Sequence, residues 1–443
     1  MSTDSMLALN TFDPAGAAHI DAVTRELVGR RSSVFGAAVP LFYEQPVNFV
    51  RAQGVWLYDH EDRPYLDAYN NVPAVGHCHP HVVEAISRQA TLINTHTRYL
   101  SDIVYSYAER LLARLPEPLA KVLFTSSGTE SVDLAMRVAR YRTGGTGFIV
   151  TRFAYHGNST AVAEITPAFG PGVPLGAHVR TVCAPDGYRG EGDVAQTFAA
   201  AVEDAIAGLT RHGIPFAGLI VDTVFSSDGL FVDPPGFLRH AVEVVRRAGG
   251  VYIADEVQPG FGRTGAGMWG FERHGVMPDM VVMGKPMGNG MPIAALVMTD
   301  ELMDAFSARS EYFNTFGGNT VCCAAASAVL DVIEKEALIA HADATGNYLK
   351  AGLQALQRTH GSIGDVRGTG LYLAVEFIET ASNDKTPDAR EALRVVNALR
   401  ARRILISVCG PAGNILKIRP PLVFSKAHCD QLLDATREIL AAA

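Results

Sequence analysis

From about residue 120 onward, short apolar runs alternate with segments of helical periodicity. KVLFT (121–125) precedes the helical pattern SVDLAMRVARYR, and AGLIVD (217–222) precedes FLRHAVEVVRRAG. GFIV (147–150), VYIADE (251–256) and MVVMG (280–284) are further runs of this kind. Apolar strands joined by helix-length connections predict a largely parallel sheet that is covered on both faces. Such a sheet places its ligands beyond the carboxyl ends of its strands.

The length of 443 residues exceeds the usual size of one hydrophobic core, so two domains are expected. The sequence predicts an α/β fold whose large domain, residues 66–325, holds a mostly parallel, seven-stranded sheet. A helix near 319–335 leads into a smaller α+β domain, residues 326–443. That domain contains the strand-like runs IGDVRGTGLYLAVEF, RRILIS and NILKIRPPLVF. Residues 1–65 include a hairpin pattern, and we expect them to pack with the small domain.

Charge and cysteine content exclude several classes of protein. The formal net charge of −8 argues against a nucleic-acid partner, which would require a basic face. No apolar run approaches the roughly 20 residues that span a bilayer, and the N-terminus lacks the pattern of a secretory signal. The six cysteines have no framework spacing, which indicates a reducing, cytoplasmic location without structural disulfides.

Two motifs resemble functional sites without the context that those sites need. GFGRTG (260–265) matches a dinucleotide-binding pattern, but Pro259 precedes it and further glycines follow, so a loop is the better interpretation. GHCHPH (76–81) holds three histidines and a cysteine, yet Pro80 leads into a helical pattern. A turn and a helix start explain these residues, and we predict no metal site.

Three other motifs carry chemistry. TSSGTES (125–131) opens a helix after a strand, so it can hold a phosphate, although the same residues also cap helices. Asp255 in IADEVQ ends an apolar strand and can face a cationic ring nitrogen or form an internal salt bridge. Lys285 in VVMGKPMGNG follows another apolar strand; in such a site its pKa falls and it can attack a carbonyl. Together the three motifs fit pyridoxal phosphate.

Over essentially its whole length the chain resembles the class III aminotransferases, which are pyridoxal-phosphate enzymes of fold type I. The resemblance is carried by YLDAYNNVPAVGHCHP, FTSSGTES, AYHGNST, IADEVQPGFGRTG, MGKPMGNGMP and YFNTFGGNT. It implies that Lys285 and Asp255 are the catalytic residues, bonded to the cofactor's aldehyde and paired with its ring nitrogen. It further implies that the cofactor contacts Ser127, Gly128, Thr129, Tyr155, Val257, Gln258 and, from a partner subunit, Thr315. That last contact implies a homodimer with shared active sites, or a tetramer built from it.

Within this family the sequence is most similar to the branch of phospho-lyases that act on ethanolamine phosphate and phosphohydroxylysine. FVRAQ, LINTHTRYL, EYFNTFGGN and NILKIRPPLVF carry that similarity. Positions where many transaminases have Glu-Pro, a switching glutamate and a carboxylate-binding arginine are here Asp222-Thr223, Ser227 and Asn158. The absence of that glutamate and that arginine weakens the case for transamination between dicarboxylate or ω-amino-acid partners, and a transaminase of ω-amine or alanine–glyoxylate type stays the alternative. A non-catalytic cofactor-binding protein is a third interpretation, and the retained site residues argue against it.

A phospho-lyase must also hold the phosphate of its substrate with charged or amide donors. The candidates for this role are Asn70, Asn71, His77, Arg98, Lys417 and Arg419. Each also has a structural interpretation, because asparagines fix turns and arginines form ordinary salt bridges. The hypothesis from sequence is therefore elimination of phosphate from O-phosphoethanolamine, or from a similar phosphorylated amine, to give acetaldehyde, ammonia and phosphate.

Overall fold

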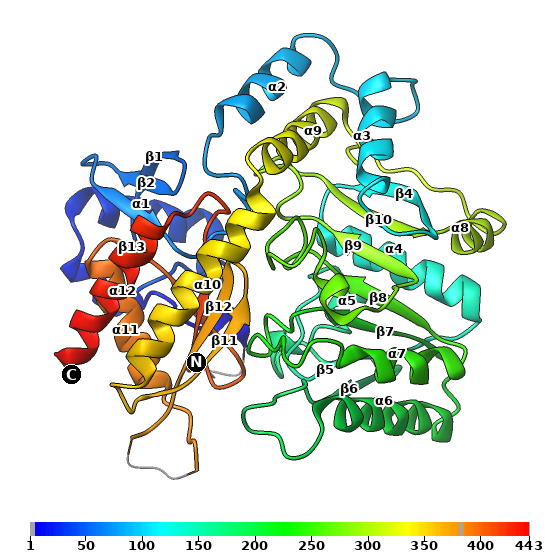
Figure 1. The fold of residues 1–443 in the computed structure, drawn as a ribbon. Helices are drawn as coiled ribbons and strands as arrows, with labels where there is room; N and C mark the ends of the chain where they lie inside the picture. The colour runs from blue at the N-terminus through cyan, green and yellow to red at the C-terminus, as the bar shows by residue number, and fades with distance from the viewer. Residues whose placement is uncertain (1–4, 381–383, 443) are drawn as a thin grey trace.

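The computed structural model describes residues 5–380 and 384–442. Its largest sheet has seven strands in the order β4-β10-β9-β8-β7-β5-β6 (Figure 1). Only β10 runs antiparallel to its neighbours, which confirms the predicted α/β fold with a mostly parallel sheet. The strands are β4 (Leu119–Thr125), β5 (Gly147–Thr151), β6 (Val179–Val182), β7 (Phe216–Asp222), β8 (Val251–Asp255), β9 (Met280–Met283) and β10 (Ala294–Thr299).

Both faces of this sheet are buried, because successive side chains along a strand point to opposite faces. In β8, Tyr252 and Ala254 belong to one apolar cluster, whereas Val251 and Ile253 belong to the other. Helices α6 (Val194–Arg211) and α7 (Leu238–Arg247) contribute to the first cluster, and α4 (Gly128–Thr143) and α8 (Asp300–Ser307) to the second. This two-sided burial explains why the strands read as continuous apolar runs.

A second sheet brings the two ends of the chain together. Its strands, in spatial order, are β1 (Phe49–Gln53), β2 (Trp56–Asp59), β3 (Pro64–Asp67) and β13 (Ile404–Leu405). The predicted hairpin is therefore a three-stranded meander, and its last strand pairs in parallel with β13. The Ala68 N–H donates to the Leu405 carbonyl at 3.0 Å, which fixes the start of the loop that follows β3.

The third sheet is antiparallel and has the order β11-β12-β15-β14. Its strands are β11 (Ile363–Thr369), β12 (Tyr372–Phe377), β14 (Ser407–Cys409) and β15 (Ile415–Ile418). The run NILKIRPPLVF contributes only β15, because the prolines at 420 and 421 have no N–H to donate to a ladder. Helices α10 (Leu338–Gln357), α11 (Ala389–Ala401) and α12 (Lys426–Ala441) lie beside these two small sheets (Figure 1).

Helix α9 (Thr320–Lys335) leads from the large sheet toward the small ones, and α10 continues the path (Figure 1). Helix α9 begins near the predicted residue 319, because the Asn319 side chain accepts from the Val321 N–H at 2.9 Å and caps the helix. The remaining helices are α1 (Ala22–Phe35), α2 (Pro80–Ala90), α3 (Asp102–Leu112) and α5 (Thr160–Ala163). Short 3₁₀ turns cover Met6–Ala8, Pro14–His19, Gly36–Ala38, Pro167–Phe169 and Gly270–His274.

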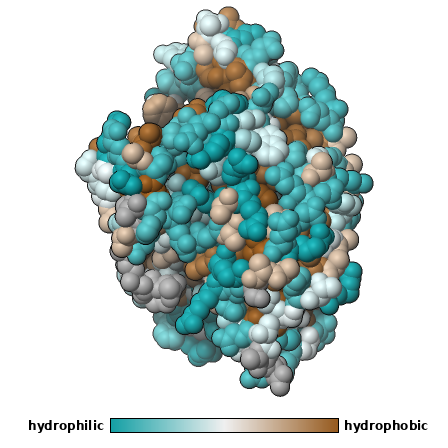
Figure 2. Space-filling model, turned by 90° about the vertical axis from the view of Figure 1, so that its left-hand side faces the viewer, coloured by the Kyte–Doolittle hydropathy of each residue, from teal (hydrophilic) through white to brown (hydrophobic). Residues whose placement is uncertain are grey.

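The face of the molecule that carries α11, α12 and the small sheets is mainly hydrophilic, with hydrophobic side chains visible between polar ones (Figure 2). Among the described residues, no helix combines the length and the apolar character that crossing a membrane would require.

Candidate active site

The carboxyl ends of three neighbouring strands meet at a cavity of about 300 Å³. Strand β7 brings Asp222 to it, β8 brings Asp255, and the segment after β9 brings Lys285. Eight of the nine residues predicted to contact the cofactor line this cavity: Ser127, Gly128, Thr129, Tyr155, Asp255, Val257, Gln258 and Lys285. The ninth, Thr315, is exposed and is not part of the lining formed by this chain.

Lys285 is partly buried and, within the described part of the chain, makes no hydrogen bond or ion pair. Burial lowers its pKa and the charge of Arg419 lowers it further, whereas Asp255 and Asp222 act in the opposite direction. The loop after it is anchored by Asn289, which accepts from the Val75 N–H at 3.1 Å and donates to the Gly76 carbonyl at 2.8 Å. The lysine is thus held in place by its backbone, and its amine stays available for reaction.

Asp255 is buried and held by two hydrogen bonds. Its Oδ2 lies 2.7 Å from Nδ1 of His156, and its Oδ1 accepts from the Val257 N–H at 3.1 Å. The other ring nitrogen of His156, Nε2, is buried without a partner among the described residues. The sequence left open an internal salt-bridge partner for Asp255, and the structure supplies one in His156. Sequence reasoning gave His156 no role, although it follows Tyr155 directly in the AYHG motif.

The N-terminus of α4 forms one end of the cavity. Ser127 caps the helix by accepting from the Glu130 N–H at 3.3 Å, and the Glu130 carboxylate accepts from the Ser126 N–H at 2.7 Å. First-turn N–H groups have no acceptor within a helix, so those of Gly128 and Thr129 can bind an anion. The capping and phosphate interpretations of this motif are thus compatible.

Two glycines allow the backbone to pack tightly at this end of the cavity. A Cβ on Gly128 would lie 2.8 Å from Cγ2 of Val257, and one on Gly157 would lie 2.5 Å from Oγ1 of Thr129. Gly157 also has a φ of +147°, which other residues rarely adopt. The backbone at both positions therefore approaches the cavity wall more closely than a larger residue would permit.

Asp222 lines the same cavity, and sequence reasoning noted it only as a departure from a family motif. It pairs in register with Asp255 on the neighbouring strand. The Val224 N–H donates to it at 3.0 Å, and both the N–H and the hydroxyl of Ser226 donate to its other oxygen. Burial raises the pKa of Asp222, and the charge of Asp255 raises it further. The sequence did contain a signal for Asp222, since the apolar runs AGLIVD and VYIAD both end in an aspartate.

Gln258 connects the cavity to a group of cations behind it. Its Oε1 accepts from the Tyr372 hydroxyl at 3.0 Å and from the Arg419 guanidinium. Arg419 is 9% exposed, lies over the ring of Tyr69, and has a buried Nε without a partner among the described residues. Its guanidinium therefore reaches the wall of the cavity through Gln258.

Lys417 and Arg263 extend this group. Lys417 is 4% exposed on β15, and burial together with the charge of Arg419 lowers its pKa to about 7. Arg263 is 2% exposed, and burial lowers its pKa to about 9. Among the described residues, neither of them nor Arg419 forms an ion pair with a carboxylate. We call Arg263, Lys417 and Arg419 the cation wall.

The loop after β3 holds the other candidates for substrate binding. The side-chain amide of Asn70 donates to both oxygens of the buried Asp67 carboxylate, and Nε2 of His77 lies 2.7 Å from Asp67 Oδ2. Asn71 is 2% exposed, and its Nδ2 has no partner in the described chain. It precedes Val72, which lines the cavity. Of these three side chains, Asn71 is the one that keeps a buried donor without a partner in the described chain.

Arg98 is not brought to the cavity of its own chain. It is exposed, and its guanidinium lies 4.1 Å from the ring centroid of Phe313, on the segment that also carries Thr315. The structure thus places Arg98 and the segment of Thr315 on one outer surface, and neither residue lines the cavity formed by this chain.

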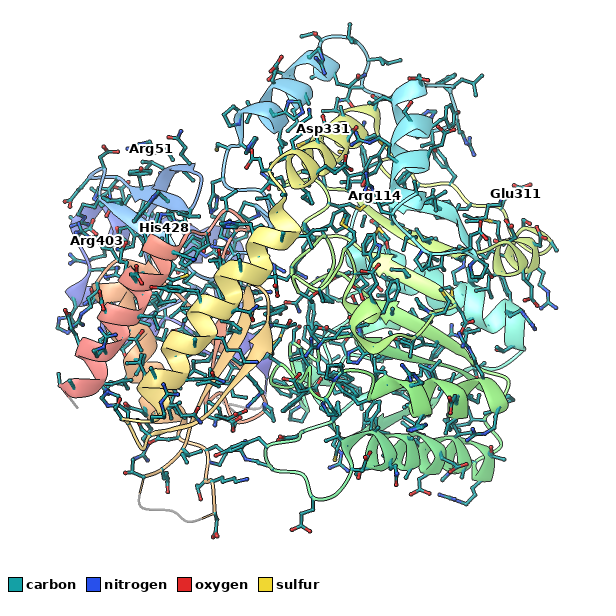
Figure 3. The ribbon with its side chains drawn as sticks, viewed as in Figure 1. Arg51, Arg114, Glu311, Asp331, Arg403 and His428 are labelled. Atoms are coloured by element: carbon teal, nitrogen blue, oxygen red, sulfur yellow. The ribbon has the colours of Figure 1, made fainter. Side chains whose placement is uncertain are left out.

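The motifs GHCHPH and GFGRTG, which resemble metal and dinucleotide sites, both have structural explanations. The histidines of GHCHPH contact three different carboxylates, with His77 on Asp67, His79 on Glu336 and His81 on Asp331, which is labelled on α9 in Figure 3. GFGRTG lies in consecutive turns between β8 and the 3₁₀ turn Gly270–His274, so no helix begins at its last glycine. The loop interpretation of that motif agrees with this geometry.

The chain is similar to known proteins over most of its length. The family model described as Aminotransferase class-III matches residues 42–440. A Drosophila melanogaster protein named Alanine–glyoxylate aminotransferase 2-like is 39% identical over 433 residues, covering 94% of this chain and 87% of that protein. A Caenorhabditis elegans protein named Ethanolamine-phosphate phospho-lyase homolog 1 is 36% identical over 449 residues, covering 96% of each. The solved structure of a phospholyase from Arthrobacter in complex with phosphoethanolamine is 44% identical, with a TM-score of 0.91, over 94% of this chain and 100% of that one.

Proposed function

The chain belongs to the class-III aminotransferase family and uses pyridoxal 5′-phosphate, and from this premise we propose that it is a phospho-lyase. Its proposed substrate is O-phosphoethanolamine or a similar phosphorylated amine. The likeness to a phospholyase that was solved with phosphoethanolamine, at 44% identity, supports this choice. So does the relative named as a phospho-lyase homolog, which aligns over nearly all of both chains.

The cavity offers a complementary group for each part of the cofactor. The first turn of α4, with Ser127, Gly128 and Thr129, is suited to its phosphate, because backbone N–H groups and the helix dipole favour an anion. Val257 and Tyr155 both line the cavity and provide surfaces for a flat ring. The ring centroid of Tyr155 lies 5.5 Å from that of Phe169, and this contact restrains the Tyr155 ring. Asp255 is proposed to face the ring nitrogen and Lys285 to meet the aldehyde.

Pyridoxal phosphate, when bound, supplies an aldehyde that condenses with an amine and a ring that accepts electrons from the adjoining carbon. The protein's part in the elimination is positioning and proton transfer. Nζ of Lys285, with its lowered pKa, is proposed to take the proton from the substrate carbon next to nitrogen. The C–O bond to phosphate then breaks, and the oxygen keeps the bonding electrons. Water completes the conversion to acetaldehyde, ammonia and phosphate.

The cation wall is the observation that carries this proposal. Burying a cation without an ion pair is costly, so Arg419, which reaches the cavity through Gln258, and Lys417 near it favour an anionic ligand that compensates them. A phosphate ester carries about 1.5 to 2 negative charges near pH 7, which is more than a single carboxylate carries. Arg419 and Lys417 are proposed to attract the substrate phosphate, and the free amide of Asn71 to donate to it.

A transaminase of alanine–glyoxylate or ω-amine type is the second candidate. The 39% identity to a protein named as an alanine–glyoxylate aminotransferase favours it, and a carboxylate of a keto acid could also bind near Arg419. The two functions differ in one measurable respect, since only the transaminase needs a keto acid in order to consume the amine.

We further propose a homodimer in which the partner supplies Thr315. Strongly exposed apolar side chains lie on residues 92–100 and 313–316, and they include Leu100 at 91% exposure and Phe316 at 68%. The two segments are adjacent, because His96 contacts the ring of Phe313. An apolar surface of this kind is typical of a protein–protein interface. All six cysteines are free, which supports the proposed cytoplasmic location.

The test uses the purified holoenzyme with phosphoethanolamine and no keto acid. We expect release of inorganic phosphate and acetaldehyde in equal amounts. Absence of phosphate release, combined with amine consumption that requires pyruvate or glyoxylate, would identify a transaminase and refute the lyase proposal. Ethanolamine without its phosphate is the matched control, because it has the same amine and no leaving group of this kind.

A further inference from the structure

Arg263 is a buried guanidinium that the proposed chemistry does not use. It belongs to the GFGRTG loop, is 2% exposed and, among the described residues, has no carboxylate partner. Its charge also opposes that of Arg419, which contributes to the lowering of its pKa. Such an arrangement is unfavourable for stability alone, so the position of this side chain calls for a functional explanation.

The guanidinium of Arg263 joins two segments that are distant in sequence. Its Nη1 donates to the carbonyl of Leu371 at 3.2 Å and to the carbonyl of Pro420, 157 residues away. The Leu371 N–H donates back to the Arg263 carbonyl at 3.1 Å. Gly370, with a φ of +55°, permits this approach, because a Cβ there would lie 2.4 Å from the carbonyl carbon of Thr264.

The residues next to these two carbonyls meet at the active-site wall. Leu371 precedes Tyr372 and Pro420 follows Arg419, and the side chains of Tyr372 and Arg419 both donate to Oε1 of Gln258. Gln258 lines the cavity and lies only five positions before Arg263 on the same loop. Arg263 therefore fixes the backbone next to each of the two residues, Tyr372 and Arg419, that donate to Gln258.

We infer that Arg263 is a positioning residue that holds Arg419 and Tyr372 on Gln258 and thereby sets the affinity of the site for the anionic group of the substrate. The inference rests on the proposed function for the identity of that anion. It assigns Arg263 an effect on substrate binding that is separate from any effect on folding.

Arg367 provides the matched comparison. It is also a buried arginine that joins distant segments, since its Nη2 donates to the Gly229 carbonyl at 2.7 Å. Unlike Arg263, it forms ion pairs with Glu376 at 2.6 Å and Asp365 at 2.8 Å, and its carbonyl partners do not adjoin the residues that donate to Gln258. A role in holding the structure together is therefore common to both arginines, whereas a role at Gln258 belongs to Arg263.

The experiment compares holoenzymes carrying Arg263→Met, Arg263→Lys, Arg419→Met or Arg367→Met. Lost charge-assisted hydrogen bonds predict that Arg263→Met raises KM for phosphoethanolamine and the inhibition constant of inorganic phosphate by about tenfold, in the same direction as Arg419→Met. We expect kcat and cofactor content to change less. Arg263→Lys should recover part of the affinity, and Arg367→Met should lower Tm while leaving KM unchanged.

An unchanged KM and phosphate inhibition constant in Arg263→Met would overturn the inference, as would an equal rise of KM in Arg367→Met. If Arg263→Met does not fold, Arg263→Lys carries the test, and wild-type affinity in that variant would also overturn it. Failure of the wild-type enzyme to release phosphate would refute the lyase proposal instead. In that case, titration of the holoenzymes with inorganic phosphate still decides the role of Arg263.

Discussion

The part of the cavity formed by the N-terminus of α4, Asp255 and Lys285, which we call the cofactor end, and the cation wall satisfy their polar groups in different ways. At the cofactor end the protein completes its own hydrogen bonds, as in the pair of Asp255 with His156 and the cap formed by Ser127 and Glu130. In the cation wall, Arg263, Lys417 and Arg419 are buried without ion pairs among the described residues. The protein thus completes the hydrogen bonds of the groups proposed to act on the cofactor, and within the described chain it leaves three buried cations without an ion pair near the proposed substrate site.

This difference has an energetic side. A site that is preorganised for an anion stores the unfavourable burial of its cations in the free protein and regains it when the anion binds. Replacing such cations by apolar residues of similar volume is therefore expected to preserve or raise stability while weakening binding. At the cofactor end, removal of a residue is expected to stop the reaction itself.

Lys285→Ala should give the largest effect. Loss of the general base alone predicts a decrease in turnover of about 100- to 10,000-fold. The absorbance band of the bound cofactor at the edge of the visible range should also change, because the amine that meets the aldehyde is gone. Steady-state phosphate release and an absorption spectrum measure both. Lys121→Ala is the control, since that lysine is exposed and pairs with Asp300 at the surface. An unaltered spectrum in Lys285→Ala would remove the lysine from its assigned role.

The cofactor end could be predicted from sequence because each of its motifs is local. Asp255 is the last residue of its strand, Lys285 and the segment Ser127–Thr129 begin two residues after theirs, and parallel strands bring their ends together. Asp222 was underestimated for a related reason. Its register with Asp255 depends on strand order, and strand order is set by tertiary packing.

The cation wall could be predicted only in part. Lys417 and Arg419 were identified as cations near a proline motif, but the partner of Arg263 lies 157 residues away and leaves no local pattern. Asn70 and His77 were predicted as substrate ligands, yet the structure directs both side chains to the buried carboxylate of Asp67. Which donors remain free depends on the burial of that one acid, and residue types alone do not reveal it.

Lys417→Met tests the cation wall through its pH dependence. With a pKa of about 7, Lys417 is charged below that pH and neutral above it, so the wild-type KM for the phosphorylated amine should rise as pH increases through about 7. Binding of the anion favours the charged amine and moves this dependence upward in the complex. At pH 6, the variant should show a KM about 10- to 100-fold higher, as expected for lost hydrogen bonds to a charged group, and a weaker dependence on pH.

Lys417→Met also tests a prediction about the stability of the protein. The pKa of Lys417 lies below its unfolded value, so the unfolded chain binds more protons between pH 7 and 10, and stability rises with pH in that range. Lys417→Met should lose this rise and unfold at a higher temperature than the wild type near pH 6. Thermal unfolding at several pH values measures it. A destabilised variant with an unchanged KM would show that Lys417 is a structural residue and would weaken the comparison.

Asn71→Ala should give the smallest effect and the sharpest contrast, because Asn70 is its matched control. The Nδ2 of Asn71 is buried without an acceptor among the described residues, whereas that of Asn70 already donates to Asp67. One hydrogen bond from this neutral amide to the charged phosphate predicts about a tenfold increase in KM for Asn71→Ala, or about 1.5 kcal/mol, the low end for a bond to a charged group, with no loss of stability. Asn70→Ala should instead lower Tm, since it removes a partner of a buried carboxylate. If the two variants changed KM and Tm alike, the free amide of Asn71 would not be a substrate ligand, and the substrate's anion would be held by the cation wall alone.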